Sequence, residues 1–162
     1  MKTHSVTYQP IGTVHTPFQD IRGMPIQPSG ASGIQGTIEI DSDYVAGLKD
    51  LEGFSHIILL YYFHQVRESK LLVVPFMDTQ QRGVFATRAP KRPNPIGLSV
   101  VKLLSIEGNV LHVENLDILD GTPLLDIKPY VPEFDEHPAD RVGWLAQARG
   151  MVLNKRSDAR FR

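Results

Sequence analysis

A proline-stiffened basic loop is the first segment whose residue types could do chemistry. In TRAPKRPNPIGLS, residues 87–99, three prolines fall within six positions, and each fixes φ and removes a backbone donor. The segment predicts a rigid, irregular loop from which Arg88, Lys91 and Arg92 could hold a phosphate or a carboxylate. A surface loop whose prolines only stabilise a turn stays open as the alternative.

A second segment, LDILDGTPLLDIKPY, combines carboxylates with an ammonium and a phenol. Its Asp120-Gly121 pair is a turn signal. If the residues after the turn are extended, Asp126, Lys128 and Tyr130 share one strand face, because side chains alternate with a period of two. Such a row could hydrogen-bond a polar ligand or move a proton. A strand with a solvated polar face is the alternative.

Charge is arranged in blocks along a chain whose net charge is only −1. Residues 79–106 hold five cations and no carboxylate, and residues 114–140 hold eight carboxylates against one lysine. Residues 141–162 hold six cations against one aspartate. The blocks predict separate anion-binding and cation-binding regions. The alternative is that the charged side chains are only solvated and that their opposite charges average out over the surface.

Several classes of protein are excluded or disfavoured by what the sequence lacks. There is no cysteine, so disulfides, thiolate metal sites and cysteine nucleophiles are ruled out. His56 and His64 would lie about 26 Å apart on an extended strand, too far for one ion, and we expect no metal site. Walker A, HExxH and GxSxG motifs are missing. The longest apolar run, residues 57–63, is far shorter than a membrane span, and the first residues lack the apolar stretch of a signal peptide, so we expect a cytoplasmic protein without a membrane partner.

The elements that must position these residues are mostly short strands. At 162 residues we expect a single domain over 1–162, with a core at about 8–145 and a basic tail at 146–162. Alternation and β-branched content predict strands at 11–16, 36–40, 54–63, 71–74, 84–87, 99–106, 110–116 and 124–130. One short helix is expected between Asp41 and Gly53. Because the regular alternation of a βαβ fold is missing, the expected fold is mainly β: a small closed or nearly closed barrel of about seven strands with one or two short helices.

Five segments together resemble successive motifs of the TrmO (TsaA-like) family. They are IGTVHTPF, GMPIQPSGA, LEGFSHIILLYYFHQ, RGVFATRAPKRPNPIGLSVV and LDILDGTPLLDIKPYVP, spread over about residues 11–144. The resemblance implies a β-barrel methyltransferase that uses S-adenosylmethionine to methylate N6 of threonylcarbamoylated adenosine beside the tRNA anticodon. It also implies a homodimer with the cofactor near the interface. Two departures stand out: Ile26 occupies a position where many bacterial relatives have arginine, and we expect no additional C-terminal domain.

The resemblance also implies a set of site residues. The implied cofactor contacts are Pro25, Ile26, Gln27, His64, Gln65, Arg88, Val100, Leu116, Asp117, Ile118, Leu119 and Asp120. The substrate tRNA is expected at Arg82, Lys91, Arg92 and Asn94.

Methyl transfer requires chiefly alignment of donor and acceptor, so it needs no metal. The acceptor nitrogen must lose a proton, for which Asp126, or Tyr130 tuned by Lys128, is the predicted acceptor, with bulk water as the alternative. Two alternatives remain: a barrel that binds a nucleoside or RNA without catalysis, and a small-molecule methyltransferase on the same fold.

Overall fold

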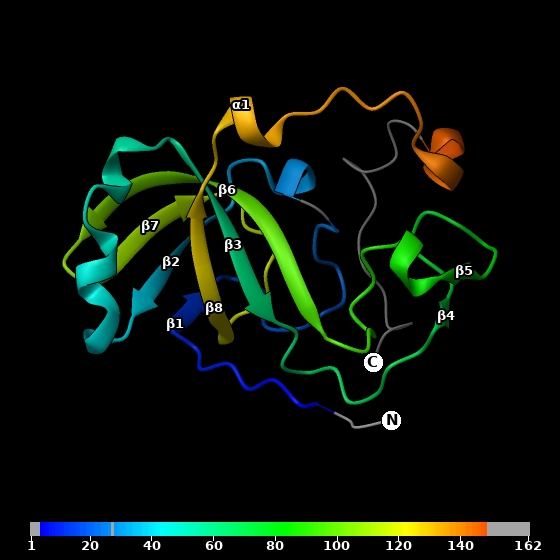
Figure 1. Cartoon of the computed structure of the whole chain (residues 1–162), viewed down its shortest axis with the longest axis horizontal. Coiled ribbons are helices and arrows are strands. Elements are labelled where there is room, and N and C mark those ends of the chain that lie inside the picture. The colour runs from blue at the N-terminus through cyan, green and yellow to red at the C-terminus, as the bar shows by residue number, and fades with distance from the viewer. Residues whose placement is uncertain (1–3, 27, 149–162) are drawn as a thin grey trace.

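Six antiparallel strands close into a barrel in the computed structural model, which describes residues 4–26 and 28–148 (Figure 1). Around the barrel the order is β1 (Gly12–His15), β2 (Gln35–Ile40), β7 (Val110–Glu114), β6 (Ile96–Glu107), β3 (His56–Tyr62) and β8 (Thr122–Pro129). The predicted closed β-barrel is therefore confirmed, with six strands in the barrel instead of about seven. Closure leaves every strand paired on both sides, so the barrel has no exposed edge.

The barrel interior follows the period of two along each strand. On β3 the buried side chains are Ile57, Leu59 and Tyr61, and on β6 the inward positions run from Gly97 through Ser99 to Val101. Most inward positions of the other strands are aliphatic, so the core is largely dry. Tyr61 and Ser99 are exceptions, and both lie toward the same end of the barrel.

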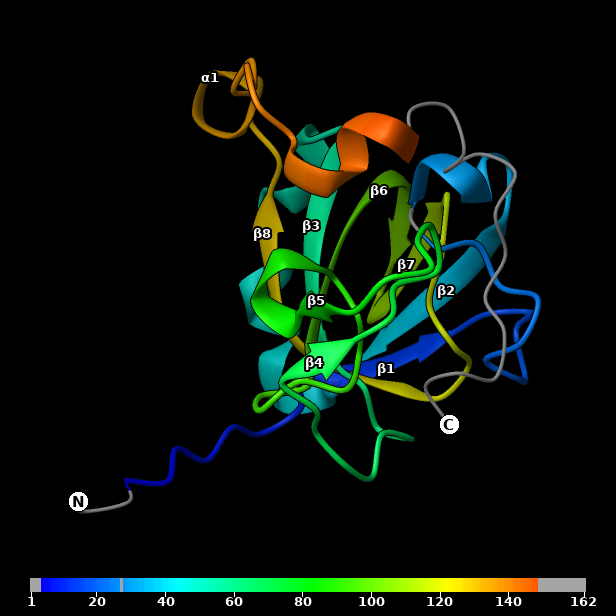
Figure 2. The same cartoon turned by 90° about the vertical axis from the view of Figure 1, so that its right-hand side faces the viewer.

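A small lobe, residues 71–92, stands in front of that end of the barrel (Figure 2). It contains β4 (Leu72–Val73), β5 (Arg82–Gly83) and the short 3-10 helix η4 (Val84–Ala86), packed around Val73, Val84 and Ala89. The predicted strand at 84–87 is wrong. The chain turns there because the Val84 carbonyl accepts hydrogen bonds from both the backbone N–H and the hydroxyl of Thr87.

The helix expected between Asp41 and Gly53 forms as two 3-10 pieces, η2 (Ser42–Leu48) and η3 (Leu51–Gly53). Val45, Leu48 and Leu51 pack against the core, and their spacing of three fits the three residues per turn of a 3-10 helix. The remaining helices are η1 (Pro28–Ala31), α1 (Pro132–Asp135) and η5 (Gly143–Ala148).

Two sequence predictions fall outside the described residues. The basic tail predicted at 146–162 lies outside them from residue 149 onward, and Gln27, a predicted cofactor contact, also lies outside them. Within 4–26 and 28–148, no helix is long and apolar enough to cross a bilayer.

Candidate functional site

A cavity of about 350 Å³ lies where the barrel, the lobe and the loop after β1 meet. This volume is within the range of small-molecule sites. Most of the wall is apolar, with a few polar groups. The lining side chains are Ile21, Met24, Pro25 and Ile26 of the loop; Tyr61, Phe63, His64, Gln65 and Val66 of β3 and its continuation; Phe76, Thr87, Arg88, Pro90 and Arg92 of the lobe; Ile96, Gly97 and Leu98 of β6; and Asp117, Ile118, Leu119 and Thr122 before and at the start of β8.

Three polar side chains are joined by hydrogen bonds at the cavity, and two of them, Tyr61 and Asp117, line it. The Tyr61 hydroxyl lies 2.9 Å from Ser99 Oγ, which donates a 2.6 Å hydrogen bond to Asp117 Oδ1. Burial raises the pKa of Asp117 to about 6, although the Ser99 bond and the nearby charge of Arg88 act in the opposite direction. Burial, followed by the charge of Asp117, raises the pKa of Tyr61, so the phenol stays neutral. Asp117 is therefore a carboxylate that is ionised at pH 7 but more basic than an exposed one.

Gly97, which lies opposite the Tyr61 ring, leaves room for these hydrogen-bonded side chains. Tyr61 pairs with Gly97 across β3 and β6, and a Cβ at Gly97 would overlap the rings of Tyr61 and Phe63. The two rings pack edge to face, with centroids 5.5 Å apart. The fit of the aromatic wall therefore depends on a position without a side chain.

His64 contributes a neutral imidazole to the cavity. Burial lowers its pKa, an effect only partly offset by a hydrogen bond with the Tyr62 backbone. Its Nδ1 lies 3.5 Å from the hydroxyl of Thr122, which itself donates to the Leu119 carbonyl at 2.6 Å. An uncharged ring suits a nucleobase or ribose better than it suits a phosphate.

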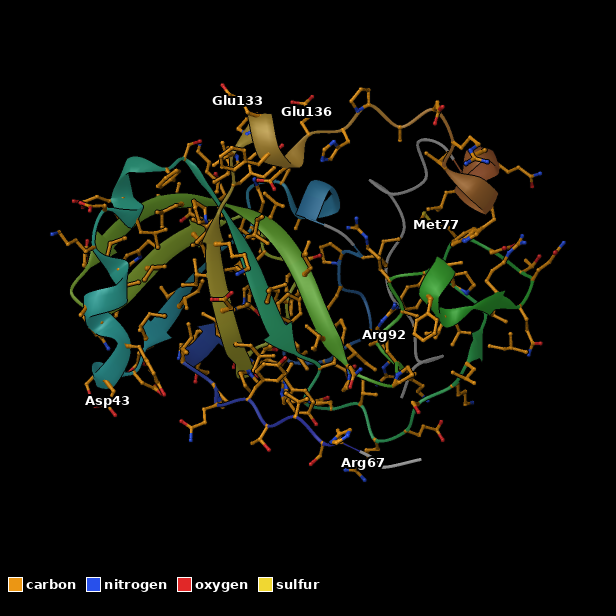
Figure 3. The ribbon with its side chains drawn as sticks, viewed as in Figure 1. Asp43, Arg67, Met77, Arg92, Glu133 and Glu136 are labelled. Carbon is orange, nitrogen blue, oxygen red and sulfur yellow. The ribbon has the colours of Figure 1, made fainter. Side chains whose placement is uncertain are left out.

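Arg92 organises the lobe side of the cavity. Its Nη1 lies 3.1, 2.8 and 3.1 Å from the carbonyl oxygens of Val84, Thr87 and Ala89, and the residue sits between barrel and lobe (Figure 3). Donation to three backbone carbonyls holds the turn that carries Arg88. Arg92 was predicted for tRNA and Arg88 for the cofactor; both line one cavity, so the structure does not separate the two roles and both stay predictions.

The other cations predicted for tRNA are placed differently. Lys91 is buried, with 4% of its side chain exposed, and its Nζ lies 2.9 Å from Glu68 Oε1. A contact with tRNA does not fit that burial, and Lys91 instead ties the lobe to the loop after β3. Arg82 forms an ion pair with Asp78 and lies 5.7 Å from the centre of the Trp144 ring. Asn94 is exposed and does not line the cavity.

The cavity brings together eight of the predicted cofactor residues: Pro25, Ile26, His64, Gln65, Arg88, Asp117, Ile118 and Leu119. Three others do not line it. Val100 occupies an outward position on β6, and Leu116 is fully buried in the core. Asp120 holds the turn before β8 by accepting a 3.0 Å hydrogen bond from the Thr16 backbone, which lowers the pKa of this carboxyl.

The predicted catalytic row lies on the outer side of the barrel. Asp126 and Lys128 form a 2.8 Å ion pair and are both well exposed, while Tyr130 packs against His56. None of the three lines the cavity. A shift of register in β8 moves Asp126 opposite Leu60, so the row faces away from the site and the proton-acceptor role predicted for it is not supported.

The sequence reasoning missed Tyr61, Ser99 and Thr87, which also line or support the cavity wall. A hydroxyl-bearing side chain at an inward position of an otherwise apolar strand is the signal that could have drawn attention to the first two. Their contact joins residues 38 positions apart, so it could not be found by local spacing.

A closed β-barrel with a mostly apolar end cavity, one partly buried carboxylate and two arginines defines a small-ligand-binding barrel protein. Residues 13–136 match the family model described as the tRNA-methyltransferase O N-terminal domain. The chain therefore belongs to the TrmO family.

Similar proteins come from archaea, bacteria and mammals. A probable S-adenosyl-L-methionine-binding protein of Pyrococcus abyssi is 53% identical over 156 residues, covering 96% of this chain and 85% of that protein. The mouse tRNA (adenine(37)-N6)-methyltransferase is 37% identical over 134 residues, covering 78% of this chain and 31% of that protein. A crystal structure of TrmO from Pseudomonas aeruginosa superposes with a TM-score of 0.74 at 39% identity, covering 88% of this chain. The chain spans 62% of that solved TrmO chain.

Proposed function

We propose that the protein is an S-adenosylmethionine-dependent methyltransferase that methylates N6 of threonylcarbamoylated adenosine next to the tRNA anticodon. The observation that carries the proposal is the cavity, in which the partly buried carboxylate of Asp117 stands in a mostly apolar wall with a few other polar groups. Membership of the TrmO family and the names of the archaeal and mouse relatives support it. A tRNA substrate further implies that the protein acts in the cytoplasm.

The residues of the cavity fit this cofactor chemically. S-adenosylmethionine carries a positively charged sulfur, an ammonium, a carboxylate and an adenosine. Asp117 can balance a positive charge, Arg88 can hold a carboxylate, and the apolar wall around Met24 and Ile118 can take the ring and the aliphatic chain. When bound, the cofactor supplies a methyl group on a good leaving group.

Asp117 is the chain's own group best suited to take the proton. A nitrogen that gains a methyl group must release its hydrogen, and the Asp117 carboxylate lines the cavity. Ser99 donates to Oδ1 and fixes the orientation of the carboxylate, while Oδ2 has no side-chain hydrogen bond among the described residues. A pKa near 6 keeps the group ionised at pH 7 and makes it a better base than an exposed aspartate.

We expect S-adenosylmethionine to raise the melting temperature. A ligand that binds only the native state adds about 2.7 kcal/mol at one hundred times its dissociation constant, which for a chain of this size corresponds to roughly 5 to 10 °C. Differential scanning fluorimetry with and without the cofactor measures the shift, with ATP as the control nucleotide. Equal melting temperatures under all three conditions would contradict the proposed cofactor.

Methyl transfer itself separates the proposal from its alternatives. The protein is incubated with labelled S-adenosylmethionine and with tRNA that either carries or lacks the threonylcarbamoyl group. Label in the modified tRNA alone supports the proposed function. Cofactor binding without transfer to either tRNA would favour a binding protein or a methyltransferase for a small molecule.

A second copy of the chain is the proposed partner, and the outer face of β3 and β6 near the cavity is the proposed contact. Tyr62 pairs with Ile96 there, and Leu98 is 47% exposed although it is a large apolar side chain. Ile96 and Leu98 also line the cavity, so a partner on this face would cover its mouth.

We expect light scattering to give twice the 18.1 kDa of one chain, and Leu98→Glu to give the mass of a monomer. Burying a glutamate in an apolar contact costs several kcal/mol unless the charge is paired. Tyr44→Glu is the matched control, because Tyr44 is exposed on η2 at the other end of the barrel (Figure 1). A dimer that survives Leu98→Glu would place the interface elsewhere.

A further inference from the structure

The lobe exposes a group of apolar side chains that the proposed cavity chemistry does not use. Phe85 is 76% exposed, the highest value for a large apolar side chain among the described residues, and Leu71 and Leu72 are also well exposed. They lie close together in the fold, because Leu72 pairs with Gly83 and the Leu71 carbonyl accepts a 2.8 Å bond from the Val84 N–H. Exposed apolar groups clustered in this way indicate a contact surface.

The backbone under Phe85 is held from several sides. Arg92 donates to the carbonyl of Val84, the residue before it, and the Trp144 indole N–H donates a 2.8 Å bond to the carbonyl of Ala86, the residue after it. Phe85 is therefore an aromatic ring presented to solvent from a fixed support. Such a ring loses little conformational entropy when a flat partner covers it.

The charge around this ring favours a polyanion. Residues 66–92 contain six lysines and arginines and two carboxylates. Both carboxylates are already paired, Glu68 with Lys91 and Lys70, and Asp78 with Arg82. Lys91 is buried, but the segment as a whole is net positive. A net positive segment with an exposed aromatic ring matches the way in which proteins bind single-stranded RNA, by attracting the backbone and stacking on bases.

The ring is also next to the cavity along the chain. Thr87, which lines the cavity, is two residues from Phe85, so their Cα atoms are at most about 7.6 Å apart. An RNA loop that delivers one base to the cavity would therefore bring a neighbouring base within reach of the lobe.

We infer that Phe85 is a stacking platform for a base of the tRNA anticodon loop next to the methylated adenosine, with Leu71 and Leu72 widening the apolar surface. This inference rests on the proposed function and adds to it the surface that holds the substrate. Phe85 is then a binding residue for RNA and has no part in holding S-adenosylmethionine.

The test compares Phe85→Ala, Phe85→Leu and Phe85→Trp with the wild type. Binding of an anticodon stem–loop RNA that carries threonylcarbamoyladenosine is measured by filter retention at one fixed salt concentration. We expect alanine and leucine to weaken binding by about 5- to 100-fold and tryptophan to retain it within threefold, because leucine restores apolar area but not a ring face. The affinity for S-adenosylmethionine, measured by calorimetry, should stay within twofold in all variants.

Phe134→Ala is the matched control, since Phe134 is 72% exposed but lies on α1, away from the lobe. It should leave RNA binding unchanged. If all Phe85 variants bind the RNA as tightly as the wild type, the stacking role is overturned while the proposed function stays intact. Variants that become monomeric but bind RNA normally would also overturn it, and would identify the lobe as a protein interface. A wild type that neither binds nor methylates the RNA would overturn the proposed function itself.

Discussion

Replacing Asp117 with asparagine is expected to lower kcat for methylation by about 100-fold or more at saturating S-adenosylmethionine. A positioned general base contributes about 10²- to 10⁴-fold, and asparagine keeps the shape of aspartate but cannot accept the proton. The measurement is transfer of labelled methyl groups to modified tRNA. Asp43→Asn is the matched control, because that carboxylate is exposed on η2, far from the cavity (Figure 3).

The pH dependence distinguishes a base from a group that only binds the cofactor. With a pKa of about 6, the ionised fraction of Asp117 rises through pH 6, so the wild-type rate should rise there and level off above pH 7. Ser99→Ala removes a hydrogen bond that lowers this pKa, so its rise should move to higher pH. An Asp117→Asn enzyme that keeps its kcat and only raises KM for the cofactor would contradict the assignment.

Asp117→Asn is also expected to increase the stability of the fold at pH 7. A carboxyl whose pKa is raised on folding adds stability while it is protonated, and that stability is lost as pH rises from about 4 through 6. A pKa of about 6 in place of 3.8 corresponds to at most about 3 kcal/mol. In urea unfolding, Asp117→Asn should therefore be more stable than the wild type at pH 7, and the difference should shrink toward pH 4. The carboxylate would then be retained at the expense of stability, as is common for catalytic groups.

The barrel could be predicted because its signals are local. The continuous apolar run at 57–63 and the alternation of apolar residues along 110–116 can be recognised without any partner strand, and both segments form barrel strands. The strand expected at 84–87 failed because hydrogen bonds from polar side chains a few residues further along the chain decide its conformation. The Val84 carbonyl is used by Thr87 and by Arg92, so the segment turns, although its residue types favour a strand.

The face of β8 illustrates why the site was only partly predictable. With a strict period of two, Thr122, Leu124, Asp126 and Lys128 would all point into the barrel. The structure pairs Leu60 with Asp126 but Tyr61 with Leu124, which leaves Leu125 as an extra residue. One extra residue exchanges the two faces of all that follows it, so Thr122 faces the cavity while Asp126 faces solvent. Nothing in the residue types marks that bulge.

Replacing Gly97 with alanine is expected to damage the site and the fold together. The new Cβ would overlap the rings of Tyr61 and Phe63, and Tyr61 cannot swing away freely because it is buried and hydrogen-bonded to Ser99. Overpacking of this kind costs about 1 to 3 kcal/mol, which corresponds to a fall in melting temperature of roughly 3 to 10 °C. The Tyr61 hydroxyl is hydrogen-bonded to Ser99, which in turn orients Asp117. A displaced Tyr61 ring would therefore disturb Asp117, and we expect the affinity for S-adenosylmethionine to fall at least about tenfold.

Gly47→Ala is the matched control for this change. A Cβ at Gly47, in η2, would meet no atom within 4 Å, so alanine there should leave the melting temperature and the cofactor affinity unchanged or slightly raise stability. Thermal unfolding and calorimetric titration on the two variants separate the steric effect of one methyl group from the general effect of losing a glycine. A Gly97→Ala protein that melts and binds like Gly47→Ala would show that the aromatic wall can yield, and that the position of Tyr61 does not control the cavity.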